Sequence, residues 1–356
     1  MRLPVLSPIL TLSLALSFAG CTYTGPHVDT LVPLDQDAWL SGEVESPGLG
    51  RISHLVVYGD SLSDNGNLNR NSFGFVVPQE VFYRGNFSNG PVWAEYVQNA
   101  LHWTLDDYAV GGAETGPGFF TERYVVTPFP AQIEKSEKRL AELDPDKTLV
   151  AIWIGPNNYL RHGAEYQNKK GEPDNSRLNT EIKRSIGDIR RGLETIIKLG
   201  FHHIVLGTMP ELGGINRSPE DTPRASDATL FLATRLHNEA LHALIKTMKT
   251  AEPGIQLITY DAYAINKKTY ERPADYAFTR LDLPCFEGSI TGKFFGPQKF
   301  CTDPMGYKFW EYLHPNTRMH CFYAAQFLGD IAESKVIGGY DKAKAIARCK
   351  AIQNRS

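Results

Sequence analysis

Residues 54–67 read HLVVYGDSLSDNGN, and this stretch decides how the rest of the chain is interpreted. Its first six residues are mostly β-branched, aromatic or aliphatic, which predicts a short buried strand. The strand ends in Gly59-Asp60, and Ser61 follows at once. In an open α/β sheet, reactive side chains lie beyond the carboxyl ends of the strands. The stretch therefore predicts a strand that presents Ser61 at a functional edge of a sheet.

Further apolar runs predict three more buried strands, and helical patterns separate them. The predicted strands cover residues 148–155, 202–208 and 255–262, and the predicted helices cover residues 91–101, 131–143, 180–198 and 225–249. Parallel strands need crossover helices, so this alternation favours a three-layer α/β/α domain with a mostly parallel sheet. Two turn-rich insertions, roughly residues 64–90 and 264–306, are where we expect substrate recognition.

The composition is that of a globular protein with a sizeable core. The chain has 356 residues, of which 42% are hydrophobic and 22% are charged. Its net charge of -3 comes from 37 basic and 40 acidic residues spread along the chain. Without a basic stripe, a nucleic-acid partner is disfavoured.

The amino-terminal residues predict export. An apolar run from Leu10 to Ala19 is too short to span a bilayer and suits a signal peptide over residues 1–20. Ala19-Gly20-Cys21 resembles a bacterial lipoprotein cleavage site, which makes Cys21 a candidate for lipidation and membrane anchoring. Ordinary cleavage, with Cys21 removed or left as a free thiol, is the alternative. We expect a protein of the bacterial cell envelope or a secreted one, with residues 21–51 as a tether.

Four further cysteines, Cys285, Cys301, Cys321 and Cys349, suit two disulfides in an exported chain. Three connectivities can be drawn. The compact one joins Cys285 to Cys301 and Cys321 to Cys349, and a loop of the first kind stabilises by roughly 3 kcal/mol. Zinc is the weaker interpretation, because no paired C-x-x-C or histidine cluster accompanies these residues.

Other predicted strand ends carry residues that could cooperate with Ser61. A Gly111-Gly112-Ala113 corner could direct a backbone N–H at a developing oxyanion, and the Asn157 amide could donate a second hydrogen bond. Near the carboxyl end, Glu311 precedes His314 by three residues. A carboxylate in that position can fix the tautomer of the imidazole that takes the serine proton.

These blocks, in this order, resemble the GDSL lipase and esterase family, also called SGNH hydrolases. The resemblance spans Gly59 to Pro315. It implies a flavodoxin-like SGNH hydrolase domain over residues 52–335, followed by a C-terminal extension, residues 336–356. Residues 335–356 mix basic residues with Ile and Ala, which favours a solvated helix tethered by Cys349 over a membrane-binding element. The resemblance also implies Ser61 as nucleophile and His314 as base, oriented by Glu311. The oxyanion hole would consist of the Ser61 and Gly112 N–H groups and Asn157, with no metal or organic cofactor.

The long opening block and the segment from Cys285 to Cys301 are similar to the bacterial branch of secreted phospholipases, lysophospholipases, haemolysins and glycerophospholipid:cholesterol acyltransferases. The implied substrate is a lipid ester, with transfer to cholesterol as a further activity, in a monomeric protein. In some relatives the cysteine-bounded segment is a disulfide-closed loop that governs access. The alternatives are an esterase of small or carbohydrate acetyl esters and a non-catalytic surface lipoprotein.

Two positions depart from the family pattern. Asn158 stands where the third block has Asp, and we expect structural rather than chemical consequences. Glu311 stands where the family has Asp; the longer side chain either reaches His314 by another rotamer or leaves a Ser-His dyad aided by a backbone carbonyl. Loss of an orienting acid can lower turnover by up to about 10⁴-fold.

Some residues allow two interpretations. Asp60 is expected to stabilise a turn by accepting backbone N–H groups. Aromatic residues of the first insertion line an acyl-chain pocket or form a satellite core; they are Phe73, Phe75, Phe82, Tyr83 and Phe87.

Overall fold

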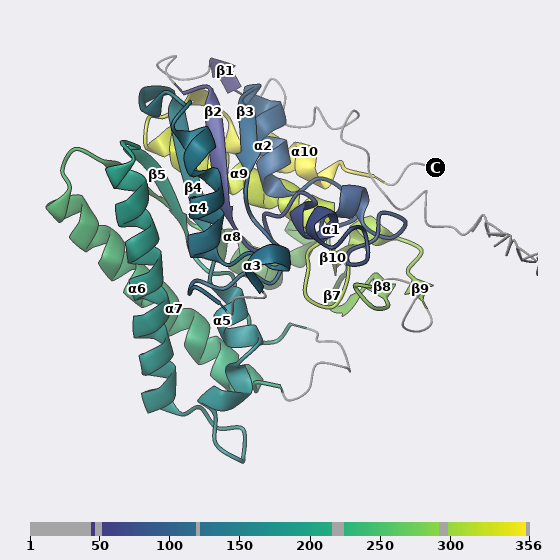
Figure 1. Cartoon of the computed structure of the whole chain (residues 1–356). Coiled ribbons are helices and arrows are strands. Elements are labelled where there is room, and N and C mark those ends of the chain that lie inside the picture. The colour runs from purple at the N-terminus through teal and green to yellow at the C-terminus, as the bar shows by residue number, and fades with distance from the viewer. Residues whose placement is uncertain (1–43, 47–51, 119–121, 216–223, 292–297, 354–356) are drawn as a thin grey trace, which may run out of the picture.

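A five-stranded parallel sheet forms the centre of the protein (Figure 1). The computed structural model describes residues 44–46, 52–118, 122–215, 224–291 and 298–353. The strand order is β3-β2-β4-β5-β6, and every neighbouring pair in this sheet is parallel. The strands are β2 (His54–Gly59), β3 (Thr104–Asp107), β4 (Thr148–Trp153), β5 (His203–Gly207) and β6 (Gln256–Tyr260). The predicted parallel α/β sheet is confirmed, with β3 added at its edge.

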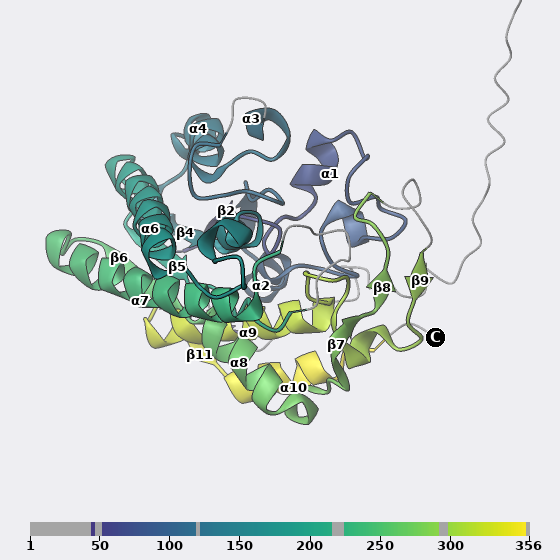
Figure 2. The same ribbon diagram turned by 90° about the horizontal axis from the view of Figure 1, so that it is seen from below.

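Helices cover both faces of the sheet, which explains why the strands are continuous apolar runs. One face packs against α4 (Phe129–Leu140), α6 (Asn175–Lys198) and α7 (Asp227–Ala251). The other packs against α2 (Trp93–Leu101), α8 (Ala262–Glu271), α9 (Thr317–Glu333) and α10 (Lys342–Lys350). Figure 2 shows α4 and α6 on the side opposite to α8, α9 and α10. The three-layer prediction is therefore confirmed.

The register of β2 and β4 brings two distant segments to the same edge. The pair runs from His54 beside Thr148 to Gly59 beside Trp153, so both strands end together. A Cβ atom on Gly59 would lie 2.5 Å from the carbonyl oxygen of Trp153. Glycine is needed there because the two backbones approach closely. Ser61 and Asn157 follow these two strands, and both residues line one cavity.

Side-chain caps set the starts of the long helices. Asp174 accepts hydrogen bonds from the N–H groups of Ser176 and Arg177, so α6 begins five residues before the predicted start at residue 180. Ser226 caps α7 through Thr229. Such capping oxygens satisfy N–H groups that have no partner within the helix.

The two predicted insertions contain short strands and two helices that the sequence patterns did not predict. The first insertion contains α1 (Asn67–Asn71). The second begins within α8 and contains β7 (Arg280–Pro284), β8 (Phe286–Glu287) and β9 (Lys299–Phe300). Parallel pairing joins β7 to β10 (Tyr307–Phe309), and antiparallel pairing joins β8 to β9. Elsewhere lie α3 (Glu122–Val125) and α5 (Pro156–Leu160). Short 3-10 helices occur at Tyr83–Gly85, Pro145–Lys147, Gly163–Tyr166, Pro273–Tyr276 and Pro304–Gly306.

The carboxyl-terminal helix packs against the rest of the protein. Helix α10 lies against α9, and Cys349 and Ile352 are fully buried in the same core cluster as α9. Strand β11 (Gly338–Tyr340) pairs with β1 (Val44–Ser46), so a part of the expected tether is also a strand. Within α10, Ala345 and Cys349 are buried and the other residues are partly or fully exposed, which confirms the predicted solvated helix.

The four described cysteines form the compact pairing. Cys285 bonds to Cys301 with a Cα–Cα distance of 4.8 Å, and Cys321 on α9 bonds to Cys349 on α10 with a Cα–Cα distance of 5.6 Å.

The predicted signal peptide and Cys21 lie outside the described residues. Within the described ranges, no helix has the length and apolarity needed to cross a membrane.

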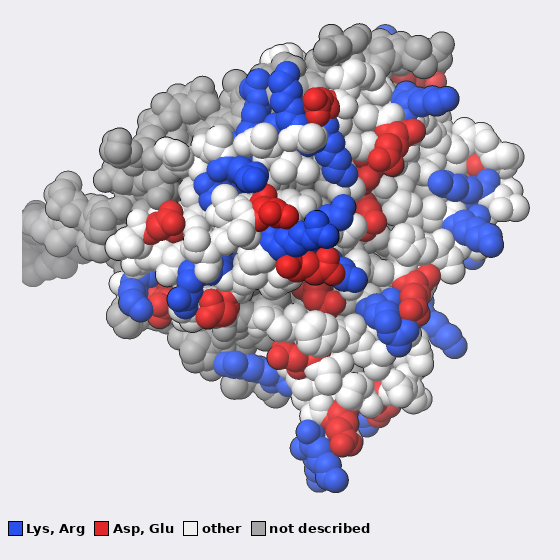
Figure 3. All heavy atoms as spheres, turned by 180° about the vertical axis from the view of Figure 1, so that it is seen from behind, with Lys and Arg blue, Asp and Glu red and all other residues white. Residues whose placement is uncertain are grey.

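Basic and acidic side chains are intermixed on the face opposite to that of Figure 1. Figure 3 shows Lys and Arg next to Asp and Glu over this face, without a broad area of one sign among the described residues. On this face, the pattern agrees with the balanced charge of the chain.

Candidate active site

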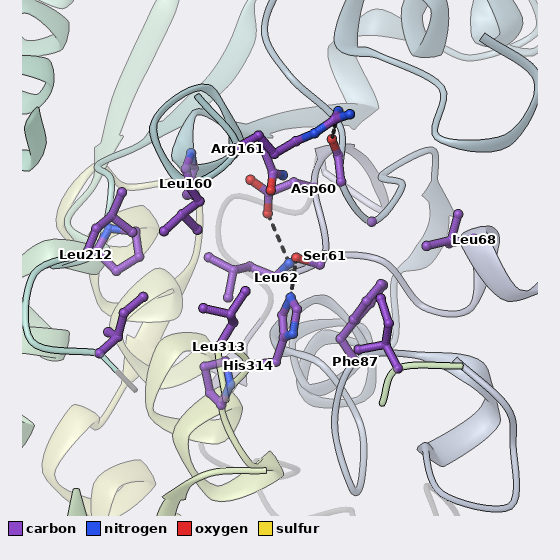
Figure 4. A pocket seen from close by; sticks show the side chains of 18 of the residues that line it. Asp60, Ser61, Leu62, Leu68, Phe87, Leu160, Arg161, Leu212, Leu313 and His314 are labelled. Carbon is purple, nitrogen blue, oxygen red and sulfur yellow. Dashed lines mark hydrogen bonds between the residues drawn. The ribbon is translucent and has the colours of Figure 1, made fainter. Parts of the chain in front are cut away.

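Ser61 lies two residues after the end of β2 and lines a cavity of about 390 Å³ (Figure 4). The cavity walls are mostly apolar and come from both insertions and from the loops that follow β4 and β5. Ser61 itself is 8% exposed. The sheet edge therefore presents a hydroxyl to a confined apolar space.

The structure brings His314 and Glu311 to Ser61. His314 Nε2 is 2.6 Å from Ser61 Oγ, and His314 Nδ1 contacts Glu311 Oε1. The same Glu311 oxygen accepts the backbone N–H of His314 at 3.0 Å. The longer side chain thus folds back over its own loop and reaches the ring. With Nδ1 as donor to the carboxylate, Nε2 is free to accept the Ser61 proton.

Phe87 fixes the position of the imidazole from one side. Its ring centroid is 4.5 Å from that of His314. A Cβ atom on Gly111 would lie 2.2 Å from the Phe87 ring, so a side chain there would displace the ring. Phe87 also lines the cavity.

The predicted oxyanion donors border the same cavity. Gly112, with φ of 80°, and Asn157, at the start of α5, both line it together with Ser61. Asn157 Nδ2 donates to the carbonyl oxygen of Ala113 at 2.9 Å, which ties α5 to the Gly112 corner. An amide nitrogen carries two hydrogens, so the other one can be donated to an oxyanion. The arrangement fits stabilisation of a tetrahedral acyl intermediate.

Asp64 joins the Ser61 loop to the Gly111 corner, a role that sequence reasoning missed. Its buried carboxylate accepts the N–H groups of Gly66, Asn67 and Leu68, and that of Gly111 at 2.7 Å. The sequence offers one signal for this role, an acidic residue within a turn rich in Gly and Asn.

Two further positioning side chains could not be found from the sequence. Gln132 on α4 accepts the N–H of Gly59 at 3.1 Å and donates to its carbonyl oxygen at 2.8 Å. Trp93 Nε1 donates to Ser63 Oγ at 2.9 Å. Both side chains hold the end of β2 from helices on opposite faces of the sheet, so Ser61 is attached to a rigid frame.

Asn158 has a structural role, as expected. Its Nδ2 donates to Glu181 Oε1 at 2.9 Å and to Thr115 Oγ1 at 3.0 Å, while its Oδ1 accepts the N–H of Thr115. An aspartate could not donate to Glu181. The amide at this position is therefore matched to a carboxylate on α6.

Asp60 stabilises the turn and also reaches the cavity. Its Oδ1 accepts the N–H of Leu62 at 3.0 Å, as predicted. Its Oδ2 is buried, and no hydrogen-bond partner is found for it among the described residues. Burial raises the pKa of this carboxyl from 3.8 to about 7. The carboxyl therefore stays neutral at pH values at which an ordinary aspartate is ionised.

The aromatic residues of the first insertion divide between three environments. Phe87 lines the cavity, Phe82 and Tyr83 are buried, and Phe73 and Phe75 are exposed. Phe82 and Phe87 belong to a satellite core with Cys285, Phe286 and Trp310. Neither sequence interpretation therefore applies to the whole set.

In the described part of the chain, no three His, Cys, Asp or Glu side chains are grouped to hold a metal ion.

Comparison with known proteins gives similar sequences that cover most of the chain. The thermolabile hemolysin of Vibrio parahaemolyticus is 25% identical over 341 residues, 89% of this chain and 72% of that protein. The phosphatidylcholine-sterol acyltransferase of Aeromonas hydrophila is 26% identical over 264 residues, 71% of each chain. An acetylesterase of Hypocrea jecorina is 22% identical over 332 residues, 81% of this chain and 91% of that protein.

A family model described as GDSL-like Lipase/Acylhydrolase matches residues 55–327. The matched range contains Ser61, Gly112, Asn157 and His314, and thus each of the four blocks. The chain therefore belongs to the GDSL-like lipase/acylhydrolase family and is an ester-hydrolysing enzyme.

Proposed function

We propose that this protein cleaves carboxylic esters of lipids through an acyl-enzyme on Ser61, with phospholipids and lysophospholipids as acyl donors. One observation carries the proposal: the linked Ser61, His314 and Glu311 side chains open into a cavity with mostly apolar walls. The names of two relatives, a hemolysin and a phosphatidylcholine-sterol acyltransferase, support lipid as the substrate class.

In the proposed reaction, Ser61 Oγ attacks the acyl carbonyl as His314 Nε2 takes the hydroxyl proton. Glu311 keeps Nδ1 protonated and stabilises the imidazolium. The negative charge on the carbonyl oxygen is met by the Ser61 and Gly112 N–H groups and the Asn157 amide. His314 then gives its proton to the leaving alcohol, which leaves an acyl ester on Ser61.

The second half of the reaction releases the acyl group. A water molecule, or a second alcohol such as a sterol, donates its proton to His314 and attacks the acyl ester of Ser61. As the bond to Ser61 Oγ breaks, His314 returns the proton to that oxygen; water gives a free fatty acid, and a sterol gives a sterol ester. The relative named as a sterol acyltransferase supports including the second route in the proposal.

The test combines covalent labelling with product identification. We expect a fluorophosphonate probe to label the wild-type protein and Ser63→Ala, and not Ser61→Ala. Incubation with mixed phospholipids, lysophospholipids and cholesterol should give fatty acid with the wild type and none with Ser61→Ala. A folded wild-type protein that takes no label would favour a non-catalytic surface protein.

A second candidate is an esterase of small or carbohydrate acetyl esters, favoured by the relative named acetylesterase. The two functions differ in acyl-chain preference. A series of nitrophenyl esters from two to sixteen carbons separates them. We expect kcat/KM to rise with chain length, because each buried methylene contributes roughly 0.8 kcal/mol; a preference for the acetyl ester would support the second candidate.

We further propose that the protein acts outside the cytoplasm and is anchored through a lipid on Cys21. The two disulfides support an oxidising compartment. Mass spectrometry of protein extracted from cells checks the anchor, because an acylated Cys21 at the mature amino terminus is the expected species. An unmodified amino terminus beyond Cys21 would contradict it.

A further inference from the structure

We propose that an exposed aromatic collar beside the cavity, formed by Phe73, Phe75 and Tyr124, binds the surface of a phospholipid bilayer. The collar would place the Ser61 cavity at the lipid surface. This inference rests on the proposed lipid substrate and adds how that substrate reaches the site.

The three collar side chains are the most exposed large hydrophobic residues of the described chain. Phe73 is 91% exposed, Phe75 is 68% exposed and Tyr124 is 66% exposed. Each of the remaining exposed large hydrophobic side chains is less than half exposed. Single exposed apolar residues are common, but a concentration of aromatic rings in two neighbouring segments indicates an interaction surface.

Hydrogen bonds hold the collar segments beside each other. Asn71 Nδ2 donates to the carbonyl oxygen of Val125 at 3.0 Å, which joins the end of α1 to α3. The N–H of Val77 donates to the carbonyl oxygen of Ile290 at 2.7 Å, which joins the same segment to the disulfide-closed loop. Both ribbon views show α1 and α3 as neighbours (Figures 1 and 2).

The collar is continuous with the cavity. Val125 and Ile290 line the cavity and are also 39% and 38% exposed, so the cavity reaches the surface at these residues. Val125 follows Tyr124 directly, and Val76, another cavity residue, follows Phe75. A lipid that left a bilayer beneath the collar would therefore meet apolar side chains as far as the cavity.

The backbone presents Phe73 to solvent in an unfavourable conformation. Phe73 has φ of 53°, in the left-handed region that a bulky side chain rarely adopts. The turn around it is nevertheless well bonded: the N–H of Gly74 donates to Asn69 O at 2.8 Å, and Asn69 Nδ2 donates to the carbonyl oxygens of Val76 and Val77. Strain that neighbouring contacts maintain is typical of functional segments.

The chemistry of the surrounding residues favours a bilayer as the occupant. Residues 65–79 contain Arg70 and no Asp or Glu, and α3 contains one acidic and one basic residue, so the two collar segments together carry no net negative charge that would repel lipid phosphates. Aromatic rings are suited to the boundary between headgroups and acyl chains. A folded protein bound across the collar would instead cover the cavity opening at Val125 and Ile290, which the proposed substrate must use.

Vesicle binding tests the collar without turnover. The full chain carries Ser61→Ala, so that vesicles stay intact, and Cys21→Ser, so that no lipid on that residue adds binding. Vesicles of phosphatidylcholine with one fifth phosphatidylglycerol are sedimented with each protein. We expect the triple variant Phe73→Ser/Phe75→Ser/Tyr124→Ser to have a partition constant for vesicles that is lower by roughly tenfold or more, because binding scales with buried apolar area.

The matched control is Leu199→Ser, a partly exposed residue at the end of α6 before β5, away from the carboxyl edge of the sheet. It should bind vesicles as the parent does. Equal binding by the collar triple variant and the parent would overturn the proposal. As a second measurement, Phe73→Trp should show a blue-shifted emission on vesicles, and an unshifted spectrum would also count against the collar.

Turnover by proteins with Ser61 intact separates this inference from the proposed function. We expect the triple variant to retain the parent's rate on a water-soluble butyrate ester and to lose about tenfold on the vesicles. An equal loss on both substrates by a folded variant would overturn the collar's role. If the parent cleaves neither substrate, the proposed function fails, while sedimentation still decides whether the collar binds lipid.

Discussion

The carboxylate of Asp64 accepts the backbone N–H of Gly111 at 2.7 Å, across 47 residues of sequence. The same carboxylate also accepts N–H groups from its own loop. A single side chain thereby fixes the distance between the proposed nucleophile and the Gly112 corner. The proposed oxyanion hole depends on this distance, because misplacement by about 1 Å can cost up to about 10²-fold in rate.

Asp64→Asn should lower kcat by about 10²-fold with little change in KM, because it misplaces a transition-state donor more than it alters the cavity. It should also lower the unfolding free energy by roughly 1–3 kcal/mol, since an amide NH₂ would face backbone N–H groups. Ester kinetics and urea unfolding measure both effects. The control is Asp146→Asn, whose side chain is 73% exposed. An unchanged kcat in the Asp64 variant would contradict this role.

Glu311→Gln should reduce turnover by roughly 10³- to 10⁴-fold, because an amide can stabilise the wrong tautomer of His314. Glu311→Asp should fall between this variant and the wild type, since the observed contact uses the extra methylene. Assays with a nitrophenyl ester give the turnover rate of each variant. Glu142→Gln, at an exposed ion pair with Arg139, should leave them unchanged. Full activity of Glu311→Gln would indicate that a Ser-His dyad is sufficient.

Asn158→Asp should destabilise the fold without altering the chemistry of folded molecules. The new carboxylate would face that of Glu181, so we expect a loss of roughly 1–3 kcal/mol near pH 7. The shared site would then have a raised carboxyl pKa, so the loss should shrink as the pH falls and one group is protonated. Thermal unfolding at several pH values measures it. Asn168→Asp, beside the exposed Glu172, is the control and should have little effect.

Asp60→Asn should change how stability depends on pH. The folded-state pKa of Asp60 is about 7, above the value of 3.8 for an ordinary aspartate. The folded state therefore keeps this proton longer than the unfolded state, and stability is lost as the pH rises from about 4 to about 7. The asparagine variant lacks this loss, so its stability relative to the wild type should increase over that range by up to ~4 kcal/mol.

Urea unfolding of both proteins from pH 4 to pH 8 gives the difference directly. Other buried acids, such as Glu95, titrate in both proteins and cancel in the comparison. Parallel stability curves for the two proteins would show that Asp60 is ionised throughout.

Much of the fold was predictable because its signals are local. The runs at residues 55–58 and 149–153 are apolar throughout, and this pattern requires burial on both faces wherever the strands lie in the sheet. The predicted helix at residues 225–249 matched α7 within two residues at each end, since its apolar face repeats with the helical period. The predicted solvated helix tethered by Cys349 is confirmed as α10, in which only Ala345 and Cys349 are buried and Cys349 bonds to Cys321 on α9.

The order of the four blocks by itself determined the family and the candidate site residues, because each of these residues lies in a short contiguous stretch of recognisable sequence. Tertiary structure decided what holds these residues in place: Gln132 on Gly59, Asp64 on Gly111, and Glu311 folded onto His314. It also decided that Phe87 lines the cavity while Phe73 meets solvent. Such contacts depend on which distant segments the parallel sheet brings to one edge, and no pattern within a single segment encodes them.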